Sequence, residues 1–220
     1  MGITIVCAVM NRAPMLSVSL VSWLRCKEVE RFIIVDWSSS DLPDELVAYF
    51  CSLDKRVSFV RVAGRELFHL SGAFNFGVAH VESEFVLKLD VDHIMNPYYN
   101  FFDFHKLGTG EFITGDWRCH GLDNDFGFLK CLNGLLFARV ADFRAVGGYN
   151  EELVGYGYED HDLYFRLKAF GLVHRLLDVR KLTVYHNPHG NEERVENYAV
   201  KDINRSILSN VKIAGGSSPI

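Results

Sequence analysis

Carboxylates at two places in this chain of 220 residues have the spacing expected of metal-binding and proton-accepting groups. Asp90 and Asp92 follow the apolar segment 85–89 (FVLKL). Alternate residues of a strand point the same way, so both carboxylates are predicted to face one ligand. Their oxygens suit Mg²⁺ or Mn²⁺ shared with a diphosphate, because such a cation neutralises the charge that grows on a departing nucleotide. A polar turn before Pro97, in which each aspartate caps the chain, explains the same residues equally well.

A second acidic group lies in segment 156–162 (YGYEDHD), which leads into a predicted helix. Glu159 and Asp160 stand four and three residues before Leu163, the first residue of the apolar stripe of that helix, so they are predicted to point inward. Asp162 instead matches Arg166 at i+4, the spacing of a surface ion pair. Favourable contact with the helix dipole accounts for Asp162, whereas inward carboxylates need a further reason to be there.

Two histidines close the last predicted strand, in the sequence YHNPHGN. A lone histidine is more often a structural hydrogen-bonding residue than a ligand. The aspartates at another strand end shift this balance toward metal binding. Either His186 or His189 could then be the ligand.

The hydrophobic pattern predicts elements that would position these groups. Strands are predicted over 3–9, 31–36, 57–62, 84–89, 111–114, 133–138, 172–178 and 182–186, and helices over 14–26, 43–53, 71–80 and 159–170. Strands and helices alternate in the first half, which predicts an α/β fold with a mostly parallel, twisted sheet and helices on both faces. Without an internal repeat or a linker, we expect one domain.

Polar residues follow three of the predicted strands, namely Asn11 and Arg12, then Asp36, then Asp90 and Asp92. Ligands of open parallel sheets bind outside the carboxyl ends of the strands, so these residues should converge on one crevice. The first strand is not followed by a GxGxxG or a GxxxxGK[ST] sequence, which argues against nicotinamide and P-loop nucleotide sites.

The composition excludes several classes of protein. Apolar residues make up 49% of the chain, and the net charge is −5 without a basic stripe, so we expect a folded core and no nucleic-acid partner. No apolar run approaches the ~20 residues of a membrane-spanning helix, and the start of the chain lacks the basic segment of a signal peptide. Five cysteines without a CxxC pair favour a reducing compartment. These features predict a cytoplasmic protein, soluble or loosely associated with a membrane.

Together these segments resemble the GT-A nucleotide-sugar glycosyltransferases, in particular the beta-4-galactosyltransferases and the bacterial chondroitin polymerase type. The resemblance covers residues 3–190. It rests on VMNR (9–12), IIVDWSSSD (33–41), FNFG (74–77), LDVDHI (89–94), CLNG (131–134), and GGYN (147–150) followed by GYGYEDHDLYFRL (155–167). The last segment is similar to the acceptor segment of the family, in which a Trp-Gly-Gly-Glu-Asp-Asp-Asp run opens a helix.

The resemblance implies a role for each matching residue on the donor side. The residues that would bind the nucleotide sugar are Asn11, Arg12, Asp36, Asn75, Asp90, Cys131 and Gly134. Asp36 would pair with the uracil edge, and the small side chain of Cys131 favours an N-acetylhexosamine. The cation, Mn²⁺ or Mg²⁺, would be held by Asp92 and His186, with Asp90 as a third ligand.

On the acceptor side, the resemblance implies that Asp160 is the general base, that Glu159 binds acceptor hydroxyls and that Tyr156 is the aromatic platform. Trp117 is a further candidate sugar contact, although a core position would explain it equally well. Tyr156 replaces the Trp of the family run, Tyr158 its Gly and His161 its Asp. These departures leave the identity of the acceptor more open than the reaction.

The function implied is an inverting, metal-dependent transfer of a hexose or N-acetylhexosamine from a UDP-sugar to a saccharide hydroxyl, as in polysaccharide biosynthesis. Residues 1–190 would form the GT-A domain, with a nucleotide half of about 1–95 and an acceptor half of about 96–190. A polar tail, 191–220, has room for one helix. One alternative is a nucleotidyltransferase, although its usual Gly- and Lys-rich loop is replaced here by NRAP. Another is a non-catalytic carbohydrate-binding domain, which the intact set of acidic residues disfavours.

Overall fold

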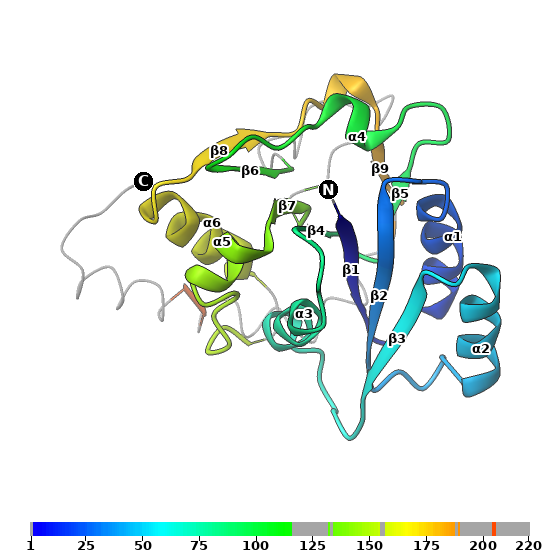
Figure 1. Cartoon of the computed structure of the whole chain (residues 1–220). Coiled ribbons are helices and arrows are strands. Elements are labelled where there is room, and N and C mark those ends of the chain that lie inside the picture. Colours follow the sequence, from blue (N-terminus) through cyan, green and yellow to red (C-terminus); the bar gives the residue numbers. More distant parts are fainter. Residues whose placement is uncertain are drawn as a thin grey trace.

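The computed structural model describes residues 2–115, 132, 134–154, 157–187, 189 and 204–205. Its centre is a seven-stranded sheet in the order β3-β2-β1-β4-β7-β6-β8 (Figure 1). The strands are β1 (Ile3–Val9), β2 (Val29–Trp37), β3 (Val57–Val62), β4 (Phe85–Lys88), β6 (Glu111–Thr114), β7 (Leu136–Arg139) and β8 (Val173–Leu176). β7 runs antiparallel to β4 and β6, and the other pairs are parallel. The prediction of a mostly parallel sheet is therefore confirmed.

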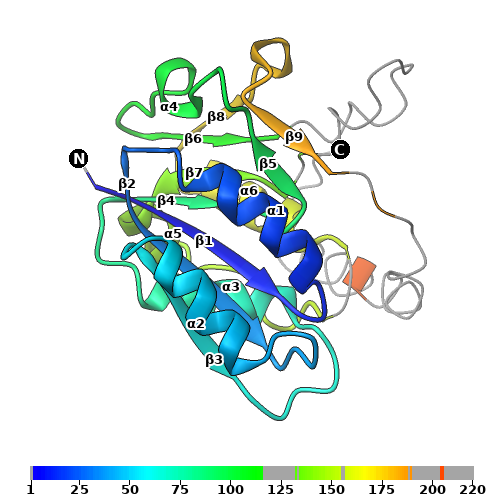
Figure 2. The ribbon, with the colours of Figure 1, turned by 90° about the vertical axis from the view of Figure 1, so that its right-hand side faces the viewer.

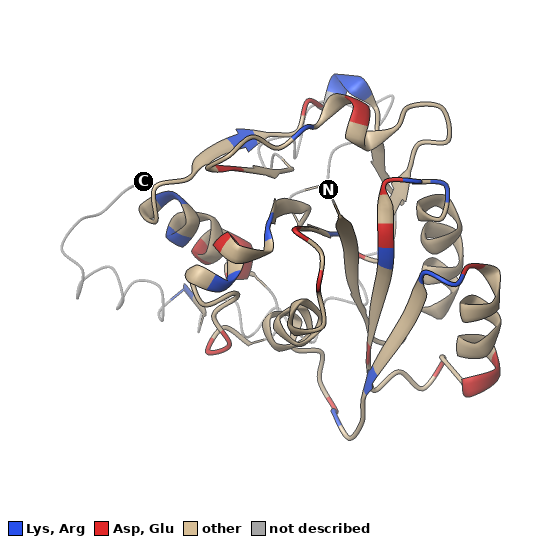
Figure 3. Cartoon of the chain, viewed as in Figure 1, with Lys and Arg blue, Asp and Glu red and all other residues tan. Residues whose placement is uncertain are grey.

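β1 lies between β2 and β4 and is buried on both faces. All of its residues are buried, and it carries no Lys, Arg, Asp or Glu (Figure 3). Its odd-numbered residues, Ile3 to Val9, belong to one apolar core, whereas Val6 and Ala8 belong to the core on the opposite face. A continuous β-branched run produces this arrangement because successive side chains of a strand point to opposite faces.

Helices cover both faces of the sheet (Figures 1 and 2). On one side lie α1 (Ala13–Trp23) and α2 (Asp44–Leu53), and on the other lie α3 (Leu70–Ala79), α5 (Val140–Ala145) and α6 (Glu159–Ala169). α1 has a proline in its first turn, where the missing N–H costs nothing, and it buries Leu16, Leu20 and Trp23 against the sheet. α4 (Phe101–Phe104) and the 3₁₀ turn η3 (Val179–Lys181) lie near one edge of the fold.

A second, two-stranded sheet pairs β5 (His93–Met95) with β9 (Val184–His186) in antiparallel register. His93 is the register partner of His186. The indole N–H of Trp23 donates to the carbonyl of His93 at 2.7 Å, which ties this small sheet to α1. A strand near 182–186 was predicted, but its partner was not, since three residues directly after the Asp-Val-Asp run give no strand pattern.

Other differences from the sequence prediction are local. The strand expected at 133–138 begins only at Leu136, and the one expected at 172–178 is limited to Val173–Leu176. α4 and α5 are too short to produce a helical period in the sequence. None of the helices in the described part of the chain is long and apolar enough to cross a membrane. The proposed domain boundary at residue 190 remains a prediction, since the structure describes only residues 204–205 of the tail.

Candidate active site

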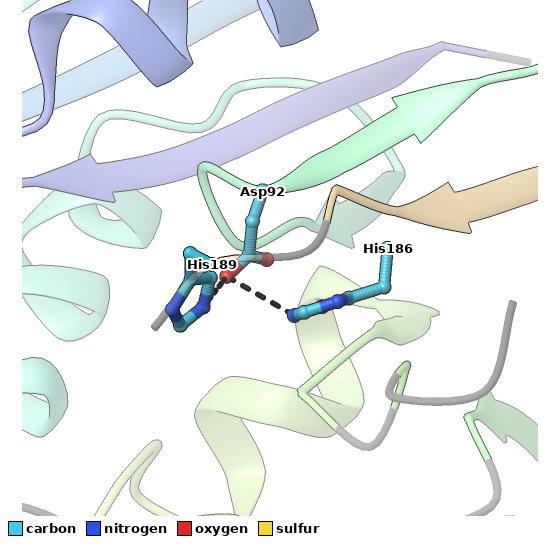
Figure 4. A group of neighbouring side chains, drawn as sticks. All are labelled: Asp92, His186 and His189. Atoms are coloured by element: carbon cyan, nitrogen blue, oxygen red, sulfur yellow. Dashed lines mark hydrogen bonds and ion pairs between the residues drawn. The ribbon is translucent and has the colours of Figure 1, made fainter. Parts of the chain in front are cut away.

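One aspartate and two histidines meet at the carboxyl edge of the sheet (Figure 4). Asp92 comes shortly after β4, His186 ends β9, and His189 follows three residues later. Nε2 of His186 lies 3.5 Å from Oδ2 of Asp92, and Nε2 of His189 lies 3.0 Å from the same oxygen. The sequence left the two histidines as alternatives, whereas the structure brings both to Asp92.

The second oxygen of Asp92 is buried, and no residue in the described part of the chain hydrogen-bonds to it. Burial disfavours ionisation of Asp92, but hydrogen bonds from His186 and His189 outweigh this effect and hold its pKa well below the usual range. A buried, ionised carboxylate with a spare oxygen beside two imidazoles is a donor set that suits Mn²⁺. The residues present therefore fit a divalent cation.

His93 supports this group from the buried side. The N–H of Asp90 donates to Nδ1 of His93 at 3.2 Å, so the neutral ring carries its proton on Nε2. That nitrogen lies 3.7 Å from Oδ1 of Asp92, and burial lowers the pKa of His93 and so favours the neutral ring. In the sequence His93 had no functional role, and no signal there reveals that it faces Asp92.

Asn11 and Arg12 follow β1, as predicted, and differ in what they contact. Nη1 of Arg12 lies 3.9 Å from Oδ2 of Asp92, so its charge belongs to the same group. The backbone N–H of Asn11 donates to Ser39 Oγ (3.1 Å), and Asn11 Oδ1 accepts from the N–H of Ser40 (2.8 Å). Asn11 thus fixes the loop after β2, while Arg12 faces the cluster.

Asp36 is completely buried, and both of its oxygens have protein partners. Nε of Arg61 lies 2.6 Å from Oδ2, and the N–H of Ser39 donates to Oδ1 at 2.9 Å. Direct pairing of Asp36 with a nucleobase, as the resemblance implied, would have to displace one of these partners. Next to it lies a pocket of about 630 Å³ whose lining includes Trp37, Arg61 and His69.

Asn75, on α3, holds the segment before α6 in place. Its amide donates to the carbonyl of Tyr149 (2.9 Å) and to Oε1 of Glu151 (2.8 Å), and its Oδ1 accepts from the N–H of Tyr149 (2.8 Å). Gly148 has φ +69°, and an added Cβ would lie 2.5 Å from Oδ1 of Asn75, so both backbone and space require glycine there. In the described contacts, Asn75 fixes the segment before α6, and its contact with the nucleotide sugar remains a prediction.

Asp160 lies at the start of α6 within a network that includes a buried lysine. Nζ of Lys88 lies 3.4 Å from Oδ1 of Asp160 and 3.1 Å from Oδ1 of Asp90. The hydroxyl of Tyr149 donates to the same Oδ1 of Asp160 at 2.9 Å. Neither Lys88 nor Tyr149 had a predicted role, although a lysine inside the apolar run FVLKL was a signal that could have found the former.

Of the remaining predicted residues, Gly134 lies against Asp90. An added Cβ at Gly134 would overlap Oδ2 of Asp90, so any other residue there would force the side chain of Asp90 to shift. Trp117, Cys131 and Tyr156 lie outside the described residues, and their roles remain predictions.

Glu159 is buried beside Asp160, as predicted for an inward carboxylate. Burial, and then the charge of Asp160, raises the pKa of Glu159 from 4.5 to about 7. Since the folded chain binds this proton more tightly than the unfolded chain, Glu159 makes the free energy of unfolding fall as pH rises from 4.5 to about 7. We expect Glu159→Gln to stabilise the protein by about 2 kcal/mol at pH 8 and hardly at all at pH 4. Urea unfolding at both pH values measures this, and an equal change at both would contradict it.

The interpretation of Asp162 as half of a surface pair was wrong. The pair with Arg166 forms, with Nη2 2.6 Å from Oδ2, but the side chain of Asp162 is only 8% exposed. Nη1 of Arg166 also donates to the carbonyls of Val146 (2.6 Å) and Gly148 (2.7 Å). The carboxylate of Asp162 is buried because the turn at Gly148 folds over this face of α6, whereas the side chain of Arg166 is 28% exposed. The i+4 spacing does not reveal this tertiary contact.

Removal of Arg166 should therefore lower the free energy of unfolding by more than the loss of an exposed ion pair does. We expect Arg166→Ala to lower the free energy of unfolding by about 3 kcal/mol, since it leaves a buried carboxylate and two carbonyls unpaired. The matched control is Arg180→Ala, which breaks the ion pair of an 86% exposed side chain with Asp178 and should hardly change the free energy of unfolding. Equal losses in urea unfolding would show that Asp162 does not depend on Arg166.

Comparisons with known proteins agree with this geometry. The family model described as "Glycosyl transferase family 2" matches residues 4–123, more than half of the chain, and the model "N-terminal domain of galactosyltransferase" matches residues 119–190. No curated protein matches the sequence significantly.

Similar folds occur among solved structures. The mannosyltransferase PcManGT from Pyrobaculum calidifontis, in complex with GDP-Man and Mn²⁺, has a TM-score of 0.63 at 16% identity, over 80% of this chain and 55% of its own. A point mutant of a Drosophila beta-1,4-galactosyltransferase 7, in complex with manganese, UDP-Gal and xylobiose, has a TM-score of 0.59 at 11% identity. The match covers 90% of this chain and 74% of the galactosyltransferase chain. TarS from S. aureus has a TM-score of 0.63 at 15% identity, over 89% and 38%. The chain thus spans about half the length of the mannosyltransferase and less of TarS.

The fold and the match over residues 4–123 confirm the resemblance seen in the sequence. The chain belongs to glycosyl transferase family 2 and has the GT-A fold.

Proposed function

We propose that the chain transfers a hexose or N-acetylhexosamine from a UDP-sugar to a saccharide hydroxyl, with inversion and with a divalent cation. One observation carries this proposal. The segment from Lys88 to Asp92 contacts the predicted base, Asp160, at one end and contributes Asp92 to the group that could hold a metal ion at the other. The Drosophila galactosyltransferase in complex with manganese, UDP-Gal and xylobiose supports the same combination of ligands.

On the donor side, Asp92, His186 and His189 would hold Mn²⁺, or Mg²⁺ in its place. A bound cation would neutralise the negative charge on the departing diphosphate. Arg12, 3.9 Å from Asp92, would add a second positive charge beside the diphosphate. The pocket next to Asp36 would take the nucleoside, because Trp37 offers an aromatic ring and Arg61 and His69 offer hydrogen-bond donors.

On the acceptor side, Asp160 would take the proton of the attacking hydroxyl. The acceptor oxygen forms its bond to the anomeric carbon on the face opposite the diphosphate, the bond to the diphosphate breaks, and UDP leaves with its electron pair. A carboxylate is a weak base, but it suffices because the hydroxyl becomes acidic as the bond forms. Glu159, close to half-protonated near neutral pH, would hydrogen-bond a neighbouring acceptor hydroxyl.

A screen of UDP-sugars with Mn²⁺ and no acceptor, with released UDP as the readout, tests the proposal. We expect slow, metal-dependent release from one donor and a higher melting temperature with UDP and Mn²⁺. The same shift with GDP and Mn²⁺, but not with UDP and Mn²⁺, would show that the donor nucleotide is a guanosine rather than a uridine diphosphate. A shift with CTP and not UDP would favour a nucleotidyltransferase, and no shift with any nucleotide would favour a carbohydrate-binding domain.

We also propose that the enzyme acts in a reducing compartment, the cytoplasm. Support comes from Cys7, Cys26 and Cys51, which are free thiols among the described residues. Burial raises the pKa of each of these thiols, which keeps them protonated and unreactive.

A further inference from the structure

Lys88 is a charged residue in the interior of the sheet. It ends β4, where its side chain is only 2% exposed, although lysine is almost never fully buried without partners. Its Nζ lies 4.5 Å from the ring centre of Phe74 and 5.7 Å from that of Tyr149, so two aromatic faces surround the ammonium group. An ammonium group in such surroundings needs anionic partners to remain charged.

Those partners come from the two halves of the site. Asp90, on the donor side, and Asp160, on the acceptor side, each direct Oδ1 to the ammonium group, at 3.1 and 3.4 Å. Burial by itself would lower the pKa of Lys88, but these two carboxylates outweigh burial and raise it. The lysine is therefore a permanent cation between the segment that leads to Asp92 and the helix that carries the predicted base.

The contacts also decide which oxygen of Asp160 is available. Lys88 and the hydroxyl of Tyr149 both contact Oδ1. The contacts described for this carboxylate leave Oδ2 as the oxygen that can receive a proton. A carboxylate held in this way presents one lone-pair direction to the acceptor and loses little entropy when the acceptor binds.

The charge of Lys88 has a second consequence. Asp90, Glu159 and Asp160 form a group of three carboxylates around this one ammonium group, and Glu159 is itself buried. Like charges at close range repel one another, and the ammonium group, in contact with both Asp90 and Asp160, offsets that repulsion.

We propose that Lys88 is a positioning residue of the transfer reaction, which fixes Oδ1 of Asp160 and couples the base to the donor-side Asp90. This inference rests on the proposed function. Because Lys88 acts through Asp160, the inference predicts an effect on the rate of transfer within the substrate complex rather than on folding.

The test compares Lys88→Met, which removes the charge at similar volume, with Lys88→Arg, which keeps it. Transfer is measured with the donor found in the UDP-sugar screen, and each rate is divided by the concentration of UDP-binding sites titrated with UDP and Mn²⁺. We expect kcat per site to fall about tenfold or more in Lys88→Met, with the KM for the donor changed less than about threefold. Lys88→Arg should retain more activity per site than Lys88→Met.

A purely structural role would lower the number of UDP-binding sites and leave kcat per site unchanged, which would overturn the proposal. If Lys88→Met yields no UDP-binding protein, Lys88→Gln takes its place, because it keeps hydrogen-bond donors without the charge. A Gln variant with wild-type kcat per site would equally overturn the role of the charge.

Tyr149→Phe is the matched control, since it removes the other hydrogen bond to the same oxygen and leaves the cation in place. We expect it to lose less kcat per site than Lys88→Met. A larger loss would assign the positioning of Asp160 to Tyr149 instead. If the wild-type chain transfers sugar from none of the donors, the proposed function and the role of Lys88 are both overturned. If only the comparison of variants fails, the role of Lys88 alone is overturned.

Discussion

Asp160→Asn is expected to abolish sugar transfer while the affinity for UDP and Mn²⁺ stays close to that of the wild type. The amide keeps the shape of the side chain but cannot take a proton, and general-base catalysis contributes roughly 10²–10⁴-fold to such reactions. Nucleotide binding should persist, because in the described contacts Asp160 faces Lys88 and Tyr149 rather than the Asp92 cluster. Initial transfer rates and calorimetric titration with UDP, each with Mn²⁺, measure the two quantities.

The matched control for this prediction is Asp103→Asn, an exposed aspartate on α4 that should transfer at the wild-type rate. Transfer by Asp160→Asn at the wild-type rate would sink the assignment of the base. Glu159, buried beside it with a pKa of about 7, would then be the next candidate.

Asp92→Ala should eliminate the part of UDP binding that depends on manganese. Asp92 is the residue that both His186 and His189 contact, and loss of a shared carboxylate ligand should weaken metal binding by at least about 100-fold. Calorimetric titration of UDP with and without Mn²⁺ measures the difference, which should vanish in the variant. If manganese still strengthens UDP binding, the metal site lies elsewhere.

Separate His186→Ala and His189→Ala variants show which imidazoles bind the cation. Both should weaken the manganese effect, because both Nε2 atoms lie within 3.5 Å of the same carboxylate oxygen. The matched control is His80→Ala, at the exposed end of α3, which should leave it unchanged. An effect of only one of the two histidines would reduce the proposed ligand set accordingly.

The first half of the fold was predictable because its signals are local. β1, β2 and β3 are rich in β-branched and aromatic residues, and α1 has a proline in its first turn. Buried parallel strands and the helices between them each carry their pattern within about ten residues. The shorter elements, such as β5 and α5, carry no such local pattern and form because of contacts with distant segments.

Sequence also identified the residue types of the site but not their partners. Asp90, Asp92 and Asp160 were found because carboxylates after an apolar strand or inside a helix stripe stand out. Their functional roles remain predictions that the variants above test. The chain alone did not reveal Lys88 as the link between Asp90 and Asp160, since the two aspartates are 70 positions apart and the contact of Asp160 with the lysine arises from packing of α6 against the sheet.

The sequence by itself therefore determined the fold class, the family and the acidic residues at the strand ends, because hydrophobic period and short motifs are written along the chain. Only the tertiary structure decided that both histidines reach Asp92, that His93 backs it, and that the oxygens of Asp36 are already occupied. These facts depend on the pairing of β5 with β9 and of β2 with β3. Register between distant strands is fixed by packing of the whole core, which no local segment encodes.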